Sequence, residues 1–330
     1  MKNKWLVGLL AVTTAFASIA FVACDKSGDD GDGAGSGEET GSVGLEYELS
    51  DDGTYYSLKG IGECTQTDIV VPNNYEGKPV QKIAAHAFNN GGITSIVIGD
   101  NVEMIGSDAF HDCFGLTTVV IGKSVSDIGE RVFMRCTSLT NIDVSDSNQS
   151  FKDIDGNLYT KSGSYLLQYA LGKRDKEFVT PGGVEGIAME AFADSEYLET
   201  AKIVCDMLGN KAFVNSKALK YVELDCESVG GSAFQNCEDL EMVKFDYSVR
   251  HVGDSAFYNC VNLKSIVISD LVTFGSYPFY GAQITKVFYT GTSNNWVENY
   301  LTSATKYIYS GTEMTDGNYW HYVDGVATAW

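Results

Sequence analysis

Histidine and cysteine side chains are the residues of this sequence best suited to chemistry. Cys113 directly follows His111 and Asp112, and a thiol near an imidazole and a carboxylate is a set that nucleophilic catalysis uses. Adjacent residues of one turn point apart, however, and His86, His111 and His251 fall in different repeats or registers. No G-x-S-x-G, H-E-x-x-H or Walker-type motif is present. We therefore predict a non-enzymatic protein with no catalytic residues, no cofactor and no metal.

The cysteines recur at regular positions, which is typical of a structural role. Four of them lie three residues after a Phe, and Ser takes that place in other repeats. A position that accepts Cys or Ser is a small buried niche. Cysteines one coil apart are within disulfide distance, and an exported protein can oxidise them, so both disulfides and free thiols remain open. The residues concerned are Cys113, Cys136, Cys237 and Cys260, with Ser195 and Ser216 as equivalents and Cys205 and Cys226 as a further pair.

A repeat of 21 to 23 residues occupies most of the chain, and one Phe marks each copy. Ala precedes the Phe in six of eight copies, and Leu follows six positions after it in six. Paired apolar residues come nine and eleven positions after it, so that a copy is close to V-x-x-I-G-x-x-A-F-x-x-C-x-x-L-x-x-I-x-I. The marker residues are Phe88, Phe110, Phe133, Phe192, Phe213, Phe234, Phe257 and Phe279.

Each copy is expected to form one coil of a solenoid. The I-x-I piece has the period of two of a short strand with one apolar face. The G-x-x-A-F-x-x-C piece is too short for an independent helix and suits one helical turn whose Phe fills the interior. One coil cannot bury its own apolar side, but stacked coils share a continuous core. The sequence thus predicts an α/β repeat solenoid with one short parallel strand per coil and short helical turns.

The pattern resembles the leucine-rich repeats of the BspA-like bacterial surface-protein family. Residues 105–121 and 252–268 are close to that family's repeat, residues 60–72 resemble its N-terminal lead-in, and residues 318–325 resemble a tail found in it. The resemblance covers about residues 47–290. It implies a leucine-rich-repeat solenoid that takes part in adhesion or binds host proteins.

The first 42 residues are expected to direct and tether the protein. Residues 1–23 have the basic start and apolar core of a signal peptide. Phe21-Val22-Ala23-Cys24 resembles a lipobox, which implies lipidation at Cys24; a plain secretory signal or an uncleaved anchor is the alternative. Residues 24–42 are acidic and Gly-rich, as in a flexible tether. An acidic run after a lipidated Cys resembles a surface-export signal, so we expect an outer-membrane lipoprotein exposed at the cell surface, with periplasmic display as the alternative.

The remaining chain divides into a cap and first coil (43–87), a solenoid (88–290) and an aromatic-rich C-terminal cap (291–330). The 59 residues between Phe133 and Phe192 exceed two repeats. Apolar runs on both sides of residues 161–164 predict an inserted β-hairpin near 145–176, within 151–171. The hairpin is either a recognition element or a tolerated insertion.

Two kinds of partner fit this organisation. A solenoid presents an extended face suited to extracellular or host proteins. Aromatic side chains also stack on sugars, so glycan binding is the alternative. The C-terminal aromatics could instead only close the open end of the core. The net charge of −21 argues against nucleic acid, and the membrane is expected to be contacted only through the N-terminal lipid. The candidate binding residues are Tyr165, Tyr169, Tyr319, Trp320 and Tyr322.

The lipidation hypothesis makes a direct prediction. In the full chain, Cys24→Ala removes the expected acceptor thiol, so the protein should move from the membrane pellet to the soluble fraction after cell lysis. Immunoblots of the two fractions measure the change, with Cys64→Ala as the control that leaves the lipobox intact. Persistent membrane association of the Cys24→Ala chain would contradict lipidation at this residue.

Overall fold

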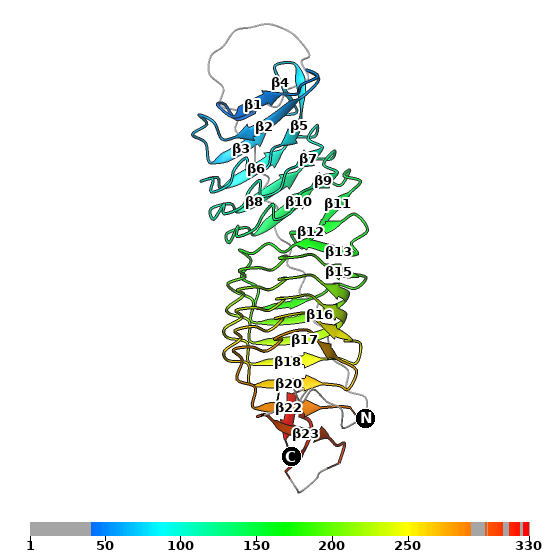
Figure 1. The fold of residues 1–330 in the computed structure, drawn as a ribbon. Helices are drawn as coiled ribbons and strands as arrows, with labels where there is room; N and C mark the ends of the chain where they lie inside the picture. Colours follow the sequence, from blue (N-terminus) through cyan, green and yellow to red (C-terminus); the bar gives the residue numbers. More distant parts are fainter. Residues whose placement is uncertain (1–40, 292–300, 302, 313–316, 324–325, 330) are drawn as a thin grey trace. The chain divides into compact units, whose positions relative to one another are not determined.

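The structure, a computed structural model, describes residues 41–291, 301, 303–312, 317–323 and 326–329 of the 330-residue chain. The chain divides into two units, residues 1–38 and 39–330, and every described residue lies in the second. The expected signal peptide (1–23), Cys24 and most of the expected tether (24–42) therefore lie outside the described residues. The described chain is built from strands and turns (Figure 1).

The strands form three sheets. The first has six strands in the order β1-β2-β5-β7-β9, with β4 beside β5: β1 (Glu46–Leu49), β2 (Tyr56–Gly60), β4 (Asn74–Tyr75), β5 (Lys78–Ile83), β7 (Met104–Ile105) and β9 (Asp127–Ile128). The second has four strands in the order β10-β8-β6-β3: β3 (Asp68–Val71), β6 (Ser95–Ile98), β8 (Thr118–Ile121) and β10 (Asn141–Val144).

The third sheet has fifteen strands and contains the C-terminal half of the described chain. Its strands are β11 (Phe151–Ile154), β12 (Asn157–Thr160), β13 (Tyr165–Gln168), β14 (Glu177–Val179), β15 (Gly186–Ile187), β16 (Thr200–Leu208), β17 (Tyr221–Val229), β18 (Met242–Phe245), β19 (His251–Val252), β20 (Ser265–Ile268), β21 (Thr273–Phe274), β22 (Lys286–Tyr289), β23 (Thr305–Tyr309), β24 (Tyr319–Val323) and β25 (Val326–Ala329).

Successive I-x-I pieces pair in parallel, one per coil. Ile96 of β6 lies beside Val119 of β8, which lies beside Ile142 of β10, and all three are buried. The V-x-x-I-G piece adds a second, two-residue strand to several coils, such as β7 and β9, which the prediction of one strand per coil missed. Gly follows this strand because the coils approach closely there: a Cβ on Gly253 would lie 2.6 Å from the backbone nitrogen of Gly231.

The prediction of short helical turns is wrong, because the described residues contain no helix. The residues two before and two after each marker Phe have positive φ angles, whereas a helix requires negative ones. The pairs are His86/Asn90, Asp108/Asp112, Arg131/Arg135, Glu190/Asp194, Lys211/Asn215, Ser232/Asn236, Ser255/Asn259 and Tyr277/Gly281.

These φ angles direct alternate backbone N–H groups to two different targets. Ala109, His111 and Cys113 donate to carbonyl oxygens three residues earlier in their own coil. Between them, Phe110 and Asp112 donate to the carbonyl oxygens of Val132 and Met134 in the next coil, each at 3.0 Å. The turn is therefore held by its neighbour as much as by itself, which a helical turn of the same length would not be.

The marker Phe side chains form a stacked ladder inside the coils. Their rings are buried, and neighbouring rings lie 4.4–5.6 Å apart with interplanar angles of 2–17°. Tyr169 supplies a rung that the sequence did not reveal, stacking on Phe192 at 4.8 Å. No ring contact joins Phe133 to Tyr169 in the described chain, and two large apolar clusters meet in this region.

The position three residues after the Phe is a hydrogen-bonding niche. The Sγ of Cys113 donates to the carbonyl oxygen of Phe88 at 3.0 Å, and Cys136, Cys237 and Cys260 repeat this contact one coil apart. Ser216 donates in the same way from its Oγ at 2.9 Å. Both side chains fit because each is small and carries a donor. All seven cysteines in the described residues are free thiols, so the structure has no Cys113–Cys136 or Cys237–Cys260 disulfide.

The insertion near 145–176 contains two hairpins rather than one. Strand β12 pairs antiparallel with β11 on one side and with β13 on the other. The side chain of buried Asn148 fixes the entrance, because it donates to the carbonyl oxygens of Gly122 and Val125 and accepts from the N–H groups of Ser150 and Phe151. Strand β13 then pairs in parallel with β15 and rejoins the solenoid.

The ladder makes a prediction for stability. Phe234→Ala removes a fully buried ring between Phe213 and Phe257, and should lower the free energy of unfolding by about 3–5 kcal/mol. Chemical denaturation of the residue 39–330 unit, which contains all the described core clusters, measures the change. The matched control is Phe114→Ala, because Phe114 is half-exposed. Equal stability of the Phe234→Ala variant and the parent would refute the ladder.

The niche predicts the reactivity of the thiols. Burial raises the pKa of Cys113 to about 11 and that of Cys260 to about 12, and the thiolate is the reactive form. During brief alkylation of the native protein near pH 8, Cys64 should be modified first among the seven described thiols, because it alone is not buried. Peptide mass spectrometry locates the label, and unfolded protein should react at all seven. Rapid labelling of native Cys113 would show that the niche is open.

Candidate functional site

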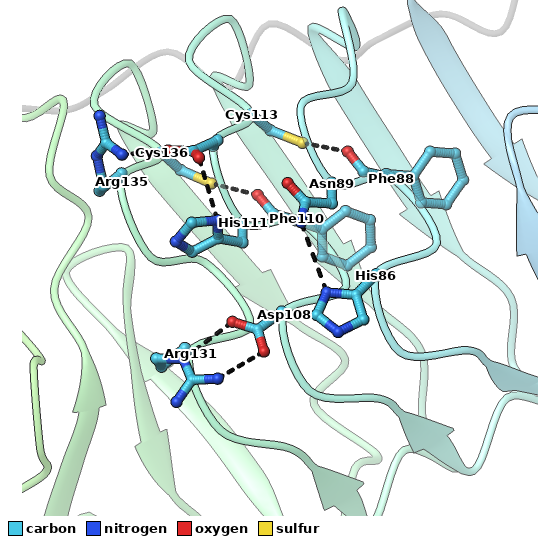
Figure 2. Close-up of polar contacts among 11 residues, drawn as sticks. His86, Phe88, Asn89, Asp108, Phe110, His111, Cys113, Arg131, Arg135 and Cys136 are labelled. Carbon is cyan, nitrogen blue, oxygen red and sulfur yellow. Dashed lines mark hydrogen bonds and ion pairs between the residues drawn. The ribbon is translucent and has the colours of Figure 1, made fainter.

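The local trio of His111, Asp112 and Cys113 does not assemble a nucleophile (Figure 2). The imidazole Nδ1 of His111 lies 3.2 Å from the carboxylate of Asp112, which also pairs with the guanidinium of Arg135 at 3.0 Å. The Sγ of Cys113 donates instead to the carbonyl oxygen of Phe88. The thiol therefore belongs to the core, while the carboxylate of Asp112 lies between the imidazole of His111 and the guanidinium of Arg135 on the next coil.

Two arginines lie on the turns of the Phe133 coil, on what we call the turn face: the turns that carry the marker Phe residues. Arg131 binds Asp108 of the previous coil through two hydrogen bonds, of 2.9 and 2.7 Å, and this contact lowers the pKa of the Asp108 carboxyl (Figure 2). Arg135 pairs with Asp112 and also lies over the ring of Phe114 at 5.3 Å. Phe114 is 47% exposed, so an apolar ring and a guanidinium are presented together.

A cavity of about 490 Å³ opens beside these arginines, where the insertion interrupts the coils. One wall is the turn of the Phe133 coil from Glu130 to Met134. The other is the turn that leads to Phe192, including Met189 and Glu190, and Leu158 and Leu167 of the insertion complete the lining. Met189 is 43% exposed. No residue of this cavity is among the candidate binding residues predicted from the sequence; the available signal is the 59-residue spacing between Phe133 and Phe192.

The outer face of the third sheet carries compensated charges. Glu199 pairs with Lys176 and Lys220 on the two adjoining coils, at 2.7 and 2.8 Å, and these contacts lower its pKa to about 2. Glu223 pairs in the same way with Lys202 and Lys244, at 3.3 and 3.1 Å. Each of these two carboxylates is thus shared between two lysines of the adjoining coils.

The C-terminal strands cover the end of the same outer face. Trp320 of β24 is fully buried, packs with Val267 and Phe288, and donates from Nε1 to the carbonyl oxygen of Tyr289 at 3.1 Å. The C-terminal aromatics therefore seal an apolar part of the sheet face. Of the expected cap, residues 292–300, 302, 313–316, 324–325 and 330 lie outside the described residues.

Burial divides the five candidate binding residues. Tyr169 and Trp320 are wrong as ligand contacts, because Tyr169 is a rung of the ladder and Trp320 is enclosed. Tyr165 is 37% and Tyr322 39% exposed, while Tyr319 is partly buried. Tyr165 lies in β13 and the other two in β24, so the structure does not bring the set together.

A second exposed aromatic group lies on the last turns. Tyr258 stacks on Tyr280 at 5.2 Å, and Tyr277 meets Tyr280 edge-on at 6.4 Å. Their exposed fractions are 36%, 60% and 67% for Tyr258, Tyr280 and Tyr277. The sequence signal was Tyr directly after two successive marker Phe residues, which places both rings on the turn face.

Two classes of feature are absent from the part of the chain that the structure describes. No group of three or more His, Cys, Asp or Glu residues is arranged to hold a metal ion there. Nor do those residues include a helix with the length and apolar character needed to cross a membrane.

Comparison with solved structures identifies similar folds. The pneumococcal vaccine antigen PcpA is 21% identical, with a TM-score of 0.58 over 72% of this chain and 68% of its own. A leucine-rich cell surface protein from Faecalibacterium prausnitzii is 20% identical, with a TM-score of 0.49 over 79% and 98% of the two chains. A leucine-rich repeat protein from Eubacterium ventriosum is 17% identical, with a TM-score of 0.45 over 78% and 96%.

The sequence matches none of the curated proteins with which it was compared. A family model, described as the BspA type leucine-rich repeat region, matches six copies over residues 62–166 and 172–286. These two ranges contain all eight marker Phe residues, and the first extends into the insertion as far as residue 166. The chain therefore belongs to the family of proteins with BspA-type leucine-rich repeats.

Proposed function

We propose that this chain is a non-enzymatic scaffold that binds an extracellular or host protein through its turn face, next to the interrupted coils. The observation that carries the proposal is the contact between Arg135 and the half-exposed ring of Phe114, on the same turn face as the 490 Å³ cavity that Arg131 and Met189 help to line. Aromatic, Met and Arg side chains are the residue types enriched where protein partners bind most strongly. The repeat scaffold supports this role, because stacked coils hold such side chains in a fixed arrangement.

The geometry of the arginines favours a protein ligand. Arg135 is held by Asp112 and Phe114, and Arg131 is held by the two hydrogen bonds that it donates to the carboxylate of Asp108. Side chains that are fixed before binding lose less conformational entropy when a partner arrives. The half-exposed Phe114 ring offers apolar area to bury beside a cation. We infer that these residues form the centre of the contact.

We further propose that the scaffold is displayed outside the cell as an outer-membrane lipoprotein. The signal-like residues 1–23 and the lipobox-like residues 21–24 support export and lipidation at Cys24. The Faecalibacterium prausnitzii protein of similar fold is described as a cell surface protein. A surface position brings the turn face to extracellular proteins, with adhesion as the consequence.

Glycan binding is the second candidate, and the exposed tyrosines of the last turns favour it. Tyr258, Tyr277 and Tyr280 present aromatic rings together at the surface, which is the type of platform on which sugar rings stack. The two candidate functions therefore use separate residues. One set of variants distinguishes them.

The residue 39–330 unit provides the test of both candidates. It is screened against extracellular-matrix and host proteins and against glycan arrays, and a bound partner is then titrated. Phe114→Ala should weaken a protein partner about tenfold or more, since central interface side chains commonly contribute above 1 kcal/mol. Tyr247→Ala, which truncates another exposed ring, is the matched control.

The outcomes separate the candidates. A protein ligand sensitive to Phe114→Ala and indifferent to Tyr247→Ala supports the turn-face scaffold. A glycan ligand lost on Tyr280→Ala, with no effect of Phe114→Ala, replaces it by the glycan function. A protein ligand that binds both Phe114→Ala and an Arg135→Ala variant at full strength overturns the proposed position of the contact.

A further inference from the structure

Regular coils obey one rule of backbone pairing on the turn face. The N–H groups two residues before the marker Phe, at the Phe, and two residues after it donate to carbonyl oxygens of the next coil. For the Phe110 coil these acceptors are Glu130, Val132 and Met134, and for the Phe192 coil they are Asn210, Ala212 and Val214. All six distances lie between 2.8 and 3.2 Å.

The rule fails where the insertion interrupts the stack. The equivalent N–H groups of Arg131, Phe133 and Arg135 have no hydrogen-bond partner among the described residues. On the opposite wall, the carbonyl oxygens of Met189 and Ala193 accept no hydrogen bond from any described residue. Ala191, between them, accepts from the N–H of Tyr169 and from the Nε2 of Gln168. The insertion thus supplies donors for one of the three carbonyl oxygens, and the other two remain unpaired among the described residues.

The 490 Å³ cavity lies between these two unpaired edges. Arg131, Phe133 and Met189 are among its lining residues, so the free donors and the free acceptor belong to its walls. Ile128 shows that a layer is missing: it lines the cavity and is partly exposed, whereas its equivalents Ile105 and Ile187 are buried. Unpaired backbone groups next to an open cavity are the condition under which a peptide adds to a protein edge.

The charge of the cavity indicates the side chain that such a peptide carries. Glu190 lines the cavity, is only 9% exposed, and its Oε2 has no hydrogen-bond partner. Lys211 reaches only the other oxygen, at 3.7 Å, and Arg131 is already bound to Asp108. A buried carboxylate oxygen without a donor is costly, and an ammonium group is the donor that compensates both its charge and its hydrogen bond.

We propose that the interruption is a seat for one extended peptide segment of a protein partner, bearing a lysine. Carbonyl oxygens of the peptide accept hydrogen bonds from the N–H groups of Arg131 and Phe133. The lysine stem lies along Leu158 and Leu167, and its ammonium group bonds to the carboxylate of Glu190. This assignment rests on the proposed protein-binding function and specifies the chemistry of its ligand.

Nuclear magnetic resonance of the ¹⁵N-labelled residue 39–330 unit tests the seat. The probe is the blocked pentapeptide acetyl-Val-Thr-Lys-Thr-Val-amide, with a second peptide in which norleucine replaces lysine. The lysine peptide should shift the amide signals of Arg131 and Phe133 and slow their hydrogen exchange, which in the free protein should be faster than that of Phe110 and Phe213. The norleucine peptide should bind about tenfold more weakly, because it lacks the charged hydrogen bond.

The matched protein variants are Glu190→Gln and Glu196→Gln, which remove the same charge six residues apart. Glu190→Gln should lower the affinity for the lysine peptide about tenfold and Glu196→Gln should not, because Glu196 lies outside the cavity. Thermal melting verifies that each variant is folded. If Glu190→Gln does not fold, the comparison of lysine with norleucine in the parent protein decides the point.

Three results would overturn the seat: no shift at Arg131 and Phe133, shifts centred elsewhere, or equal affinity for the two peptides. Any of these together with a protein partner sensitive to Phe114→Ala leaves the scaffold function standing and shows that the interruption is a solvated gap. Peptide binding at the seat with no partner in the protein screen supports the seat and counts against the turn-face contact around Phe114.

Discussion

The hydrogen bonds that pass from one coil to the next are the interaction on which the rest of this structure depends. They exist because the residues on either side of each marker Phe adopt positive φ angles, which turn alternate N–H groups out of their own coil. That backbone positions the Phe rings to stack, and it places the thiol or hydroxyl three residues later against the previous Phe carbonyl. Backbone pairing, ring stacking and the Cys or Ser niche are thus parts of one arrangement, repeated every 21 to 23 residues.

The same dependence explains why the interruption between Phe133 and Phe192 matters. A solenoid coil is stabilised largely by its neighbours, so a missing neighbour leaves backbone groups unpaired unless another segment supplies partners for them. On the Phe192 side, Tyr169 supplies the missing aromatic ring of the ladder. The Nε2 of Gln168 donates a hydrogen bond to a carbonyl oxygen that would otherwise lack this donor. On the other side, the backbone N–H groups of Arg131, Phe133 and Arg135 remain without an acceptor among the described residues. The core therefore accommodates the insertion, but backbone N–H and carbonyl groups next to it remain unpaired among the described residues.

Charge distribution refines the picture of the surface. The chain carries a net charge of −21, and some of its carboxylates pair with lysines on adjoining coils, as at Glu199 and Glu223. Exposed ion pairs of this kind contribute little to stability, but they reduce the charge available to a ligand. The carboxylate of Glu190 differs because it is buried and half-unpaired. A basic partner is favoured both by the overall charge and by this one group.

Sequence reasoning located most of the core and little of the surface. The ladder positions followed from periodicity, since a Phe every 21 to 23 residues has one consistent place in a stack. The prediction of a helical turn was wrong, because the apolar pattern of eight residues does not show that two of them have positive φ angles. The available signal was the Asn or Asp two residues after several marker Phe residues, such as Asn215 and Asp194, since these residue types adopt positive φ angles more readily than most. Tyr169 and Trp320 were assigned to the surface because an aromatic residue outside the repeat has no periodic spacing that indicates whether its side chain is buried.

By itself, then, the sequence determined the repeat, its inward and outward positions, and the existence of an insertion, because these are encoded by the spacing of residues along one coil. Only the tertiary structure decided how the coils join, that Trp320 closes the sheet face, and that Glu190 faces a cavity beside unpaired N–H groups. Those features arise from contacts between residues more than twenty positions apart. Such contacts depend on which segment occupies the neighbouring layer, and no pattern within a single repeat records that.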